Sequence, residues 1–322
     1  MDEFVITEDF PKDQLEFDRR FADESACLEY LSQLRWPGGF SCTRCGNTRY
    51  WESARGLYIC CTCEYHQSVT AGTIFHATRK PLTTWFKALW WFSTRKSGVN
   101  AVNLQQLLDL GSYKTAWEWL QKLRNCTIRI GREKLSGNIE IDEFYLGGKR
   151  GKKGRGSKYK CAIAVAVERK GKKLGRLRMQ VITRCTAKEL VPFVTNNVIS
   201  GSSITTDGWA GYNGLEDKGY HHKKIFQSKL EDKDSVLPGV HLIASLVKRL
   251  ILGTFQGRFE EKYLQRYLDE YVFRFNRRST KSVGKRFWRM IQFAAASKPM
   301  TSAQVVSARY APSLLHQLEP SR

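Results

Sequence analysis

Two pairs of cysteines constrain the fold of this 322-residue chain more than any other feature. Two residues separate Cys42 from Cys45 and Cys60 from Cys63, and fourteen residues lie between the pairs. Four thiolates in two such turns surround a tetrahedral zinc ion and leave no open position for water. The spacing therefore predicts one structural zinc ion, bound in a segment too small to have a core of its own.

Three neighbouring residues are alternative zinc ligands. Cys61 adjoins Cys60, but a separation of two residues is the commoner one, and His66 or His76 would bind only in place of a cysteine. The chain has nine cysteines, an odd number, and an acidic start without the pattern of a signal peptide. This usage predicts metal binding in a reducing compartment rather than disulfides, and hence a cytoplasmic protein.

The charge of the chain favours a polyanionic partner. Lys and Arg number 53 against 31 Asp and Glu, a net charge of +22. Such an excess points to nucleic acid ahead of a membrane surface. Apolar runs such as 162–167 and 242–247 are far shorter than the roughly 20 residues that span a bilayer. No membrane partner is expected.

Residues 81–130 are aromatic-rich and have a helical period, with apolar residues three and four apart. Two further helices are expected at 99–110 and 113–124, since Gly111 suits a helix C-terminus and Ser112 the next N-cap. The short turn between them resembles a helix-turn-helix, although any helical hairpin shows the same pattern. Lys114 lies near the start of the candidate recognition helix.

From residue 138 the period changes to two. Strands are expected at 138–146, 158–168, 175–184 and 202–207, with a weaker strand at 221–226 and a helix at 186–198. Three strands, a helix and a further strand form the order of a ribonuclease-H-like fold, a mixed sheet flanked by helices. The chain is thus predicted to be a multi-domain α/β protein.

These patterns divide the chain into five segments. They are an N-terminal helical segment at 1–39, a zinc ribbon at 40–80, a helical DNA-binding region at 81–135, a ribonuclease-H-like catalytic domain at 136–295 and a tail at 296–322.

Two of the expected strands lead into an aspartate, Asp142 in the first and Asp207 in the fourth. Such carboxylates hold two divalent cations roughly 4 Å apart on either side of a scissile phosphate. In so basic a chain, the pair indicates an enzyme that acts on nucleic acid. The alternative is that each aspartate only ends a strand or caps a turn.

Two basic clusters are expected to contact DNA phosphates, and such contacts weaken as salt is added. One is the loop 147–160, which has seven Lys or Arg and five Gly, although a plain solvated loop would look the same. The other ends a long helix near residue 275. The candidates are Lys149, Arg150, Lys152, Lys153, Arg155, Arg274, Arg277 and Arg278.

Several motifs, in order, resemble prokaryotic insertion-sequence transposases with an N-terminal zinc ribbon. The matching segments are 42–46 with 67–75, 139–143, 206–212 and 267–278, so the resemblance extends from about residue 24 to 295. It implies a DDE-type transposase, a polynucleotidyl transferase that depends on Mg²⁺. It also implies that the protein recognises terminal inverted repeats in double-stranded DNA, inserts into target DNA, and works at the nucleoid as a homo-oligomer, because two ends must be joined.

The third metal ligand departs from the pattern of the family, which generally has Glu or Asn seven residues before a Lys. Here Lys248 matches the lysine and His241 stands seven residues before it, 34 residues after Asp207. The resemblance implies that Asp142, Asp207 and His241 hold two Mg²⁺ ions, for which Mn²⁺ can substitute, and that Lys248 touches DNA. A surface or capping role is the alternative for His241, since imidazole is a softer ligand than carboxylate.

Three functions follow from these patterns. The first is transposition by nicking at the element ends and strand transfer. A metal-dependent, structure-specific DNA nuclease would share the metal site without needing a module that binds ends. A zinc-ribbon DNA-binding regulator would leave the segment 136–295 without a role.

Overall fold

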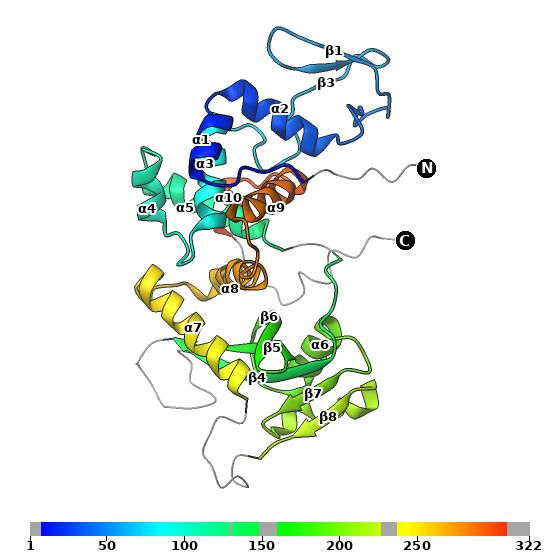
Figure 1. Ribbon diagram of the computed structural model, residues 1–322, viewed down its shortest axis with the longest axis vertical. Helices are drawn as coiled ribbons and strands as arrows, with labels where there is room; N and C mark the ends of the chain where they lie inside the picture. The colour runs from blue at the N-terminus through cyan, green and yellow to red at the C-terminus, as the bar shows by residue number, and fades with distance from the viewer. Residues whose placement is uncertain (1–7, 129–130, 148–159, 227–236, 308–322) are drawn as a thin grey trace. The chain divides into compact units, whose positions relative to one another are not determined.

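The computed structural model describes residues 8–128, 131–147, 160–226 and 237–307 (Figure 1). The chain divides into two compact units. Among these residues, the first unit comprises 8–127 and 279–307, and the second comprises 128, 131–147, 160–226 and 237–278. The basic loop 148–159, with Lys149, Arg150, Lys152, Lys153 and Arg155, lies outside the described residues.

The first unit combines a small antiparallel sheet with helices. The sheet has the order β1-β2-β3. In chain order the elements are α1 (Gln14–Arg20), α2 (Glu24–Arg35), β1 (Tyr50–Glu52), β2 (Tyr58–Cys60), β3 (His66–Gln67), α3 (Leu82–Thr94), α4 (Ala101–Leu107), α5 (Tyr113–Asn125), α9 (Val283–Ala296) and α10 (Ser302–Val306).

The core of the first unit is aromatic. The ring of Phe17 in α1 stacks on that of Trp90 in α3 with centroids 4.6 Å apart, and Phe287 in α9 lies edge-on to Phe17 at 5.3 Å. Phe287 also meets Phe86 of α3, and it is fully buried. The helix α9 therefore belongs to this unit, whereas the sequence had placed it in the catalytic segment 136–295.

The helical hairpin differs from its prediction at the turn. Helix α4 ends at Leu107 rather than near residue 110, and Asp109, not Gly111, has the positive φ of 45° that follows a helix end. Ser112 caps α5 as predicted, because its Oγ accepts a hydrogen bond of 3.1 Å from the N–H of Thr115. Trp119 of α5 stacks on Trp85 of α3 at 3.6 Å, which anchors α5 in the unit.

The second unit is built on a five-stranded mixed sheet of order β6-β5-β4-β7-β8. β4, β5 and β6 are antiparallel to one another, β7 runs parallel to β4, and β8 parallel to β7. The strands are β4 (Asn138–Gly147), β5 (Lys160–Lys170), β6 (Lys173–Ile182), β7 (Ser203–Thr206) and β8 (His221–Lys224). The predicted ribonuclease-H-like fold is confirmed.

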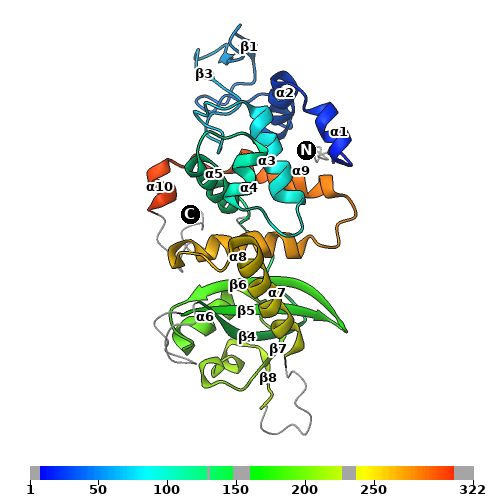
Figure 2. The same cartoon turned by 90° about the vertical axis from the view of Figure 1, so that its left-hand side faces the viewer.

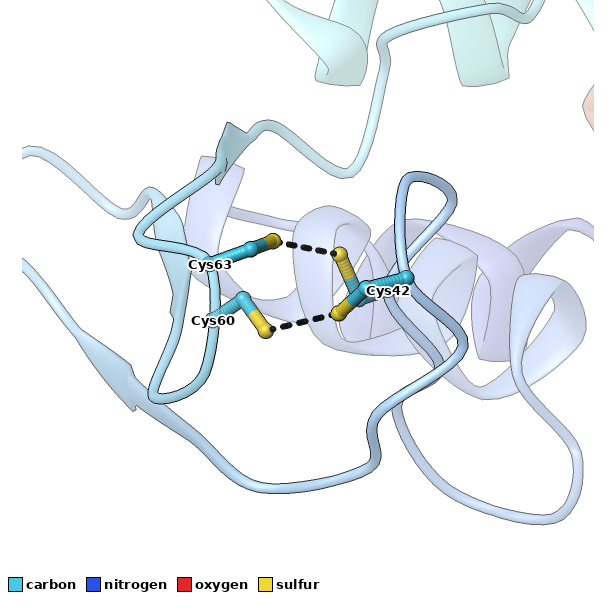
Figure 3. A group of neighbouring side chains, drawn as sticks. Cys42, Cys60 and Cys63 are labelled. Atoms are coloured by element: carbon cyan, nitrogen blue, oxygen red, sulfur yellow. Dashed lines mark hydrogen bonds between the residues drawn. The ribbon is translucent and has the colours of Figure 1, made fainter.

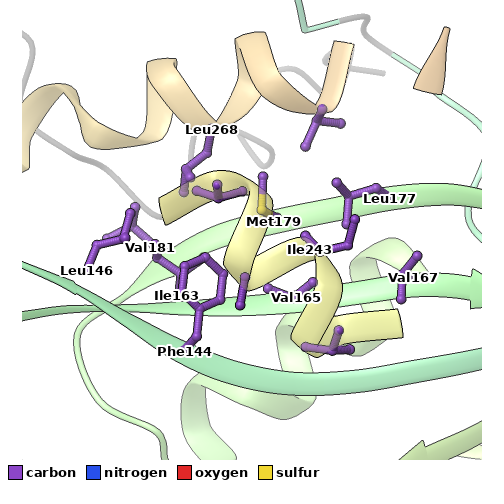
Figure 4. Close-up of a cluster of buried hydrophobic side chains, with 14 of the residues drawn as sticks. Phe144, Leu146, Ile163, Val165, Val167, Leu177, Met179, Val181, Ile243 and Leu268 are labelled. Carbon is purple, nitrogen blue, oxygen red and sulfur yellow. The ribbon is translucent and has the colours of Figure 1, made fainter. Parts of the chain in front are cut away.

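Helices cover both faces of this sheet (Figure 2). α6 (Ala187–Asn197) packs on one face, and α7 (Pro238–Phe255) and α8 (Glu261–Asn276) pack on the other. Alternation along β5 separates two cores, because Ala162, Ala164 and Ala166 face α6 while Ile163, Val165 and Val167 face α7 and α8 (Figure 4). The sheet is therefore buried on both sides.

Helix α7 is the only element among the described residues that is long and apolar enough to cross a membrane, with 18 residues and a mean hydropathy of 1.2. One third of it is buried. The helix contributes Val240, Ile243 and Val247 to the core of the unit, as expected of a helix that covers a sheet. Length and composition alone are therefore weak evidence for a membrane segment here.

Candidate active site and zinc site

The four predicted zinc ligands come together in the first unit. The Sγ atoms of Cys42, Cys45, Cys60 and Cys63 all lie within 4.8 Å of one another. Cys42 and Cys63 are 3.6 Å apart and Cys45 and Cys60 are 3.5 Å apart (Figure 3). Zn–S bonds of about 2.3 Å in a tetrahedron put sulfur atoms about 3.8 Å apart, so the cluster has the dimensions of a structural zinc site.

Local backbone geometry favours the thiolate at one of these four cysteines, Cys60. The N–H groups of Cys63 and Thr62 point at the Cys60 sulfur and lower the pKa of that thiol to about 6, which favours the thiolate that binds zinc. Cys42 and Cys60 are buried against Phe40, so the site is part of a small core. The alternatives Cys61, His66 and His76 lie outside the cluster.

The sheet of the second unit aligns the two candidate catalytic aspartates. In the parallel pair β4–β7, Glu140 lies opposite Thr205, and two residues further along both segments reach an aspartate, Asp142 and Asp207. Since side chains alternate along strands, residues two apart share a face. Asp142 therefore lies on the same face of β4 as Phe144. Phe144 belongs to the core between the sheet and helices α7 and α8.

A local hydrogen bond holds one oxygen of each aspartate. Oδ1 of Asp142 accepts from the N–H of Glu143 at 2.8 Å, and Oδ1 of Asp207 accepts from the N–H of Trp209 at 3.0 Å. The second turn depends on Gly208, whose φ is +82° and whose missing Cβ would lie 2.5 Å from the Phe226 ring. Both carboxylates are thus fixed by backbone that immediately follows them.

Helix α7 brings His241 to Asp142. Nε2 of His241 is 3.7 Å from Oδ2 of Asp142, and the histidine side chain is half exposed, at 53%. His241 lies in the first turn of the helix, where its own N–H bonds to the carbonyl of Leu237. Asp142, Asp207 and His241 are not gathered as closely as the four cysteines, which form the only cluster of that tightness among the described residues.

A buried tyrosine under the aspartates was not predicted. The hydroxyl of Tyr212 donates a 3.0 Å hydrogen bond to Oε2 of Glu143. Burial raises the pKa of Tyr212 well above its usual value, and the carboxylates of Glu143, Asp142 and Asp207 act in the same direction. The tyrosine therefore stays protonated and supports Glu143, the residue next to Asp142 in the middle of β4. Its position in the segment 206–212 was the available signal.

The other predicted DNA contacts differ in exposure. Lys248 is exposed on α7, with Nζ 5.9 Å from the ring of Phe144, and Lys114 is 73% exposed at the start of α5. Arg278 is exposed, and Arg277 lies half-buried over Phe273.

Arg274 is a correction. Its Nη2 is 2.7 Å from Oε1 of Glu270, and the two side chains are only 10% and 1% exposed. A buried glutamate one turn earlier on α8 requires a partner for its charge, since an unpaired buried carboxylate is costly. Arg274 is therefore engaged by Glu270 and largely covered, so it is less available for a phosphate contact than the sequence predicted.

The fold and two matches to known families define a polynucleotidyl-transferase-type enzyme. Residues 134–276 match a family model described as an ISXO2-like transposase domain, and residues 22–66 match one described as a transposase zinc-ribbon domain. Together the matches cover more than half of the chain, and the chain belongs to this family of insertion-sequence transposases. The family implies DNA as the partner. No curated protein matches the chain.

Proposed function

We propose that the protein moves an insertion sequence by metal-dependent nicking at the terminal inverted repeats and strand transfer into target DNA, in the cytoplasm at the nucleoid. The observation that carries the proposal is the approach of two ligand-type side chains, with a third in register on the neighbouring strand. Parallel pairing aligns Asp142 with Asp207, and α7 holds His241 at 3.7 Å from Asp142. Basic residues supply the attraction for a DNA backbone, with the chain at +22 overall.

The donor set fits divalent cations. Two carboxylates and an imidazole are ligands for Mg²⁺ or Mn²⁺, with oxygen the preferred donor for both. Ligands about 2.1 Å from an octahedral ion are about 3 Å apart, so 3.7 Å between His241 and Asp142 is near the separation of two ligands of one ion. Asp142, Asp207 and His241 would hold such ions, which when bound would activate the attacking water or 3′-hydroxyl and stabilise the leaving oxygen.

The protein's own residues then orient the substrate. Lys248 stands two turns after His241 on the exposed side of α7, near Phe144, which follows Asp142 by two residues in β4. There its ammonium group is positioned to bind a phosphate next to the scissile one. Because two element ends must be joined, we propose that the enzyme acts as a homo-oligomer on DNA.

A cleavage assay on linear DNA with and without inverted-repeat ends tests the proposal. Cutting at the ends that requires Mg²⁺ supports transposition. Cutting of branched DNA regardless of sequence would instead indicate a structure-specific nuclease. Binding without any cutting would indicate a regulator.

His241→Ala is expected to lower the nicking rate by about 10- to 100-fold or more, because the site loses one metal ligand. His241→Glu is expected to retain activity, because a carboxylate suits Mg²⁺ at least as well as an imidazole does. Single-turnover nicking rates across a range of Mg²⁺ concentrations measure both effects. A wild-type rate for His241→Ala would place the third ligand elsewhere and leave the two aspartates standing.

Lys114→Ala is expected to weaken binding to element ends by roughly 1–3 kcal/mol if this lysine reads bases in the major groove. Stability should not change, because Lys114 is 73% exposed and its ion pair with Glu118 is long, at 3.9 Å. Competition binding against random DNA measures the preference, with Lys87→Ala, an exposed lysine on α3, as the control.

The full-length protein is required for this measurement, because the first unit includes residues 279–307. Equal loss of affinity for ends and for random DNA would show that Lys114 only contacts phosphate. No loss at all would remove α5 from the interface.

A further inference from the structure

Glu140 connects the strand that bears Asp142 to the helix that bears His241. Its Oε2 accepts hydrogen bonds from the backbone N–H groups of Gly239, at 2.7 Å, and Val240, at 3.2 Å. These groups belong to the first turn of α7, where N–H donors have no partner within the helix. The residue before the helix, Leu237, supplies no side-chain cap. A buried carboxylate from β4 therefore caps α7 instead.

The second oxygen of Glu140 is also engaged. Its Oε1 lies 3.2 Å from Nε of Arg169, which ends the neighbouring strand β5. The Glu140 side chain is only 10% exposed, so its charge is balanced by this guanidinium and by the positive end of the helix dipole. We call the contacts of Glu140 with Arg169, Gly239 and Val240 the helix clamp.

The clamp requires glycine at position 239. A Cβ there would lie 2.6 Å from Oε2 of Glu140, 3.0 Å from Leu174 and 3.2 Å from Arg169. Contacts under 3.0 Å force a shift, and the atom in the way is the oxygen that caps the helix. Glycine is therefore needed for the close approach, because a larger residue would have to displace the Glu140 carboxylate from the start of α7.

Glu140 lies where a metal ligand could lie, but its carboxylate oxygens already contact protein donors. It lies two residues before Asp142 and so faces the same side of the sheet. Both of its oxygens, however, are committed to donors of the clamp. Val240 immediately precedes His241, so the clamp determines where the imidazole lies relative to Asp142.

We propose that Glu140 is a positioning residue: by clamping the first turn of α7 to β4, it sets the separation of His241 and Asp142 and thereby the affinity of this pair for a divalent cation. The inference rests on the proposed function, because it assumes that these side chains bind the catalytic metal.

The test is a double-mutant cycle between Gly239→Ala and Glu140→Ala in the zinc-loaded, full-length protein, with Mn²⁺ alone as the probe. Gly239→Ala is expected to weaken Mn²⁺ binding, measured calorimetrically, by about 10- to 100-fold. In the Glu140→Ala background the same change should have less than about a twofold effect, because the carboxylate that the new methyl group meets is gone. Gly253→Ala, also on α7 but with nothing within 4 Å of its added Cβ, is the matched control and should bind as wild type does.

Hydrogen exchange provides a readout that needs no metal. The amide of Val240 should exchange faster in Gly239→Ala and Glu140→Ala, and at the wild-type rate in Gly253→Ala. If Gly239→Ala does not fold, Glu140→Gln decides, because it keeps an oxygen acceptor. It must then weaken Mn²⁺ binding less than Glu140→Ala does.

Two outcomes distinguish a failure of the helix clamp from a failure of the proposed catalytic metal site. Unchanged Mn²⁺ affinity in Gly239→Ala, or equal effects of this change in both backgrounds, would overturn the clamp if Asp142→Asn still weakens binding. Mn²⁺ binding that is insensitive to Asp142→Asn would overturn the metal site itself.

Discussion

Asp142→Asn and Asp207→Asn are each expected to reduce nicking and strand transfer by on the order of a thousandfold or more, while DNA affinity is retained. The amide has the shape of the carboxylate, and its oxygen still accepts the hydrogen bond that the N–H of Glu143 or Trp209 donates to Oδ1. The local fold should therefore survive. Only the negative charge that binds a divalent cation is lost.

The measurement pairs single-turnover nicking with equilibrium binding of the same DNA. Asp217→Asn is the control, because this exposed aspartate lies in the short helix η2 (Glu216–Lys218), outside strands β4 and β7. The affinity for DNA should stay the same or rise slightly in the Asp142→Asn and Asp207→Asn variants, since each loses one negative charge. Near-normal nicking in either aspartate variant would exclude that residue as a metal ligand.

Cys45→Ser is expected to remove the zinc ion and unfold the ribbon, while the second unit stays folded. Structural zinc contributes roughly 10–16 kcal/mol of apparent binding free energy in small domains, and this segment has only a small core around Phe40 to replace it. Elemental analysis should fall from one zinc per chain to none. Binding to element ends should weaken, and Mn²⁺ affinity at the catalytic pair should not change.

Cys61→Ser is the matched control for the zinc variant. Cys61 is exposed and adjacent to a ligand, but its sulfur is not part of the cluster. It should therefore retain full zinc content. Protein purified without chelator and found to contain no zinc would contradict the site as a whole.

The sequence predicted the parts of the fold that local pattern controls. The period of two in β4 and β5, the cysteine spacing and the Ser112 cap are properties of neighbouring residues, and all three are confirmed. The two aspartates were visible for the same reason, although Asp142 lies in the middle of β4 and only Asp207 directly follows a strand end. His241 required comparison with a family pattern, since nothing in its immediate neighbours marks it.

Contacts between distant segments could not be predicted in this way. Glu140 caps a helix that begins 98 residues later in the chain, so the motif around it resembles an ordinary strand. Arg274 looked like part of an exposed basic cluster because its partner Glu270 is buried only once α8 packs on the sheet. The assignment of α9 failed similarly, because its aromatic partners are in α1 and α3.

The return of α9 to the first unit sets an order of folding during synthesis. Among the described residues, the second unit lies in the chain between the two portions of the first, so the ribosome releases it before residues 279–307 can complete the first unit. The catalytic sheet can fold as soon as it emerges. The aromatic core of the first unit cannot be completed until Phe287, which packs on Phe17, Phe86 and Trp90, has been synthesised. A nascent chain stopped at residue 278 would therefore carry a finished catalytic sheet and an unfinished N-terminal core.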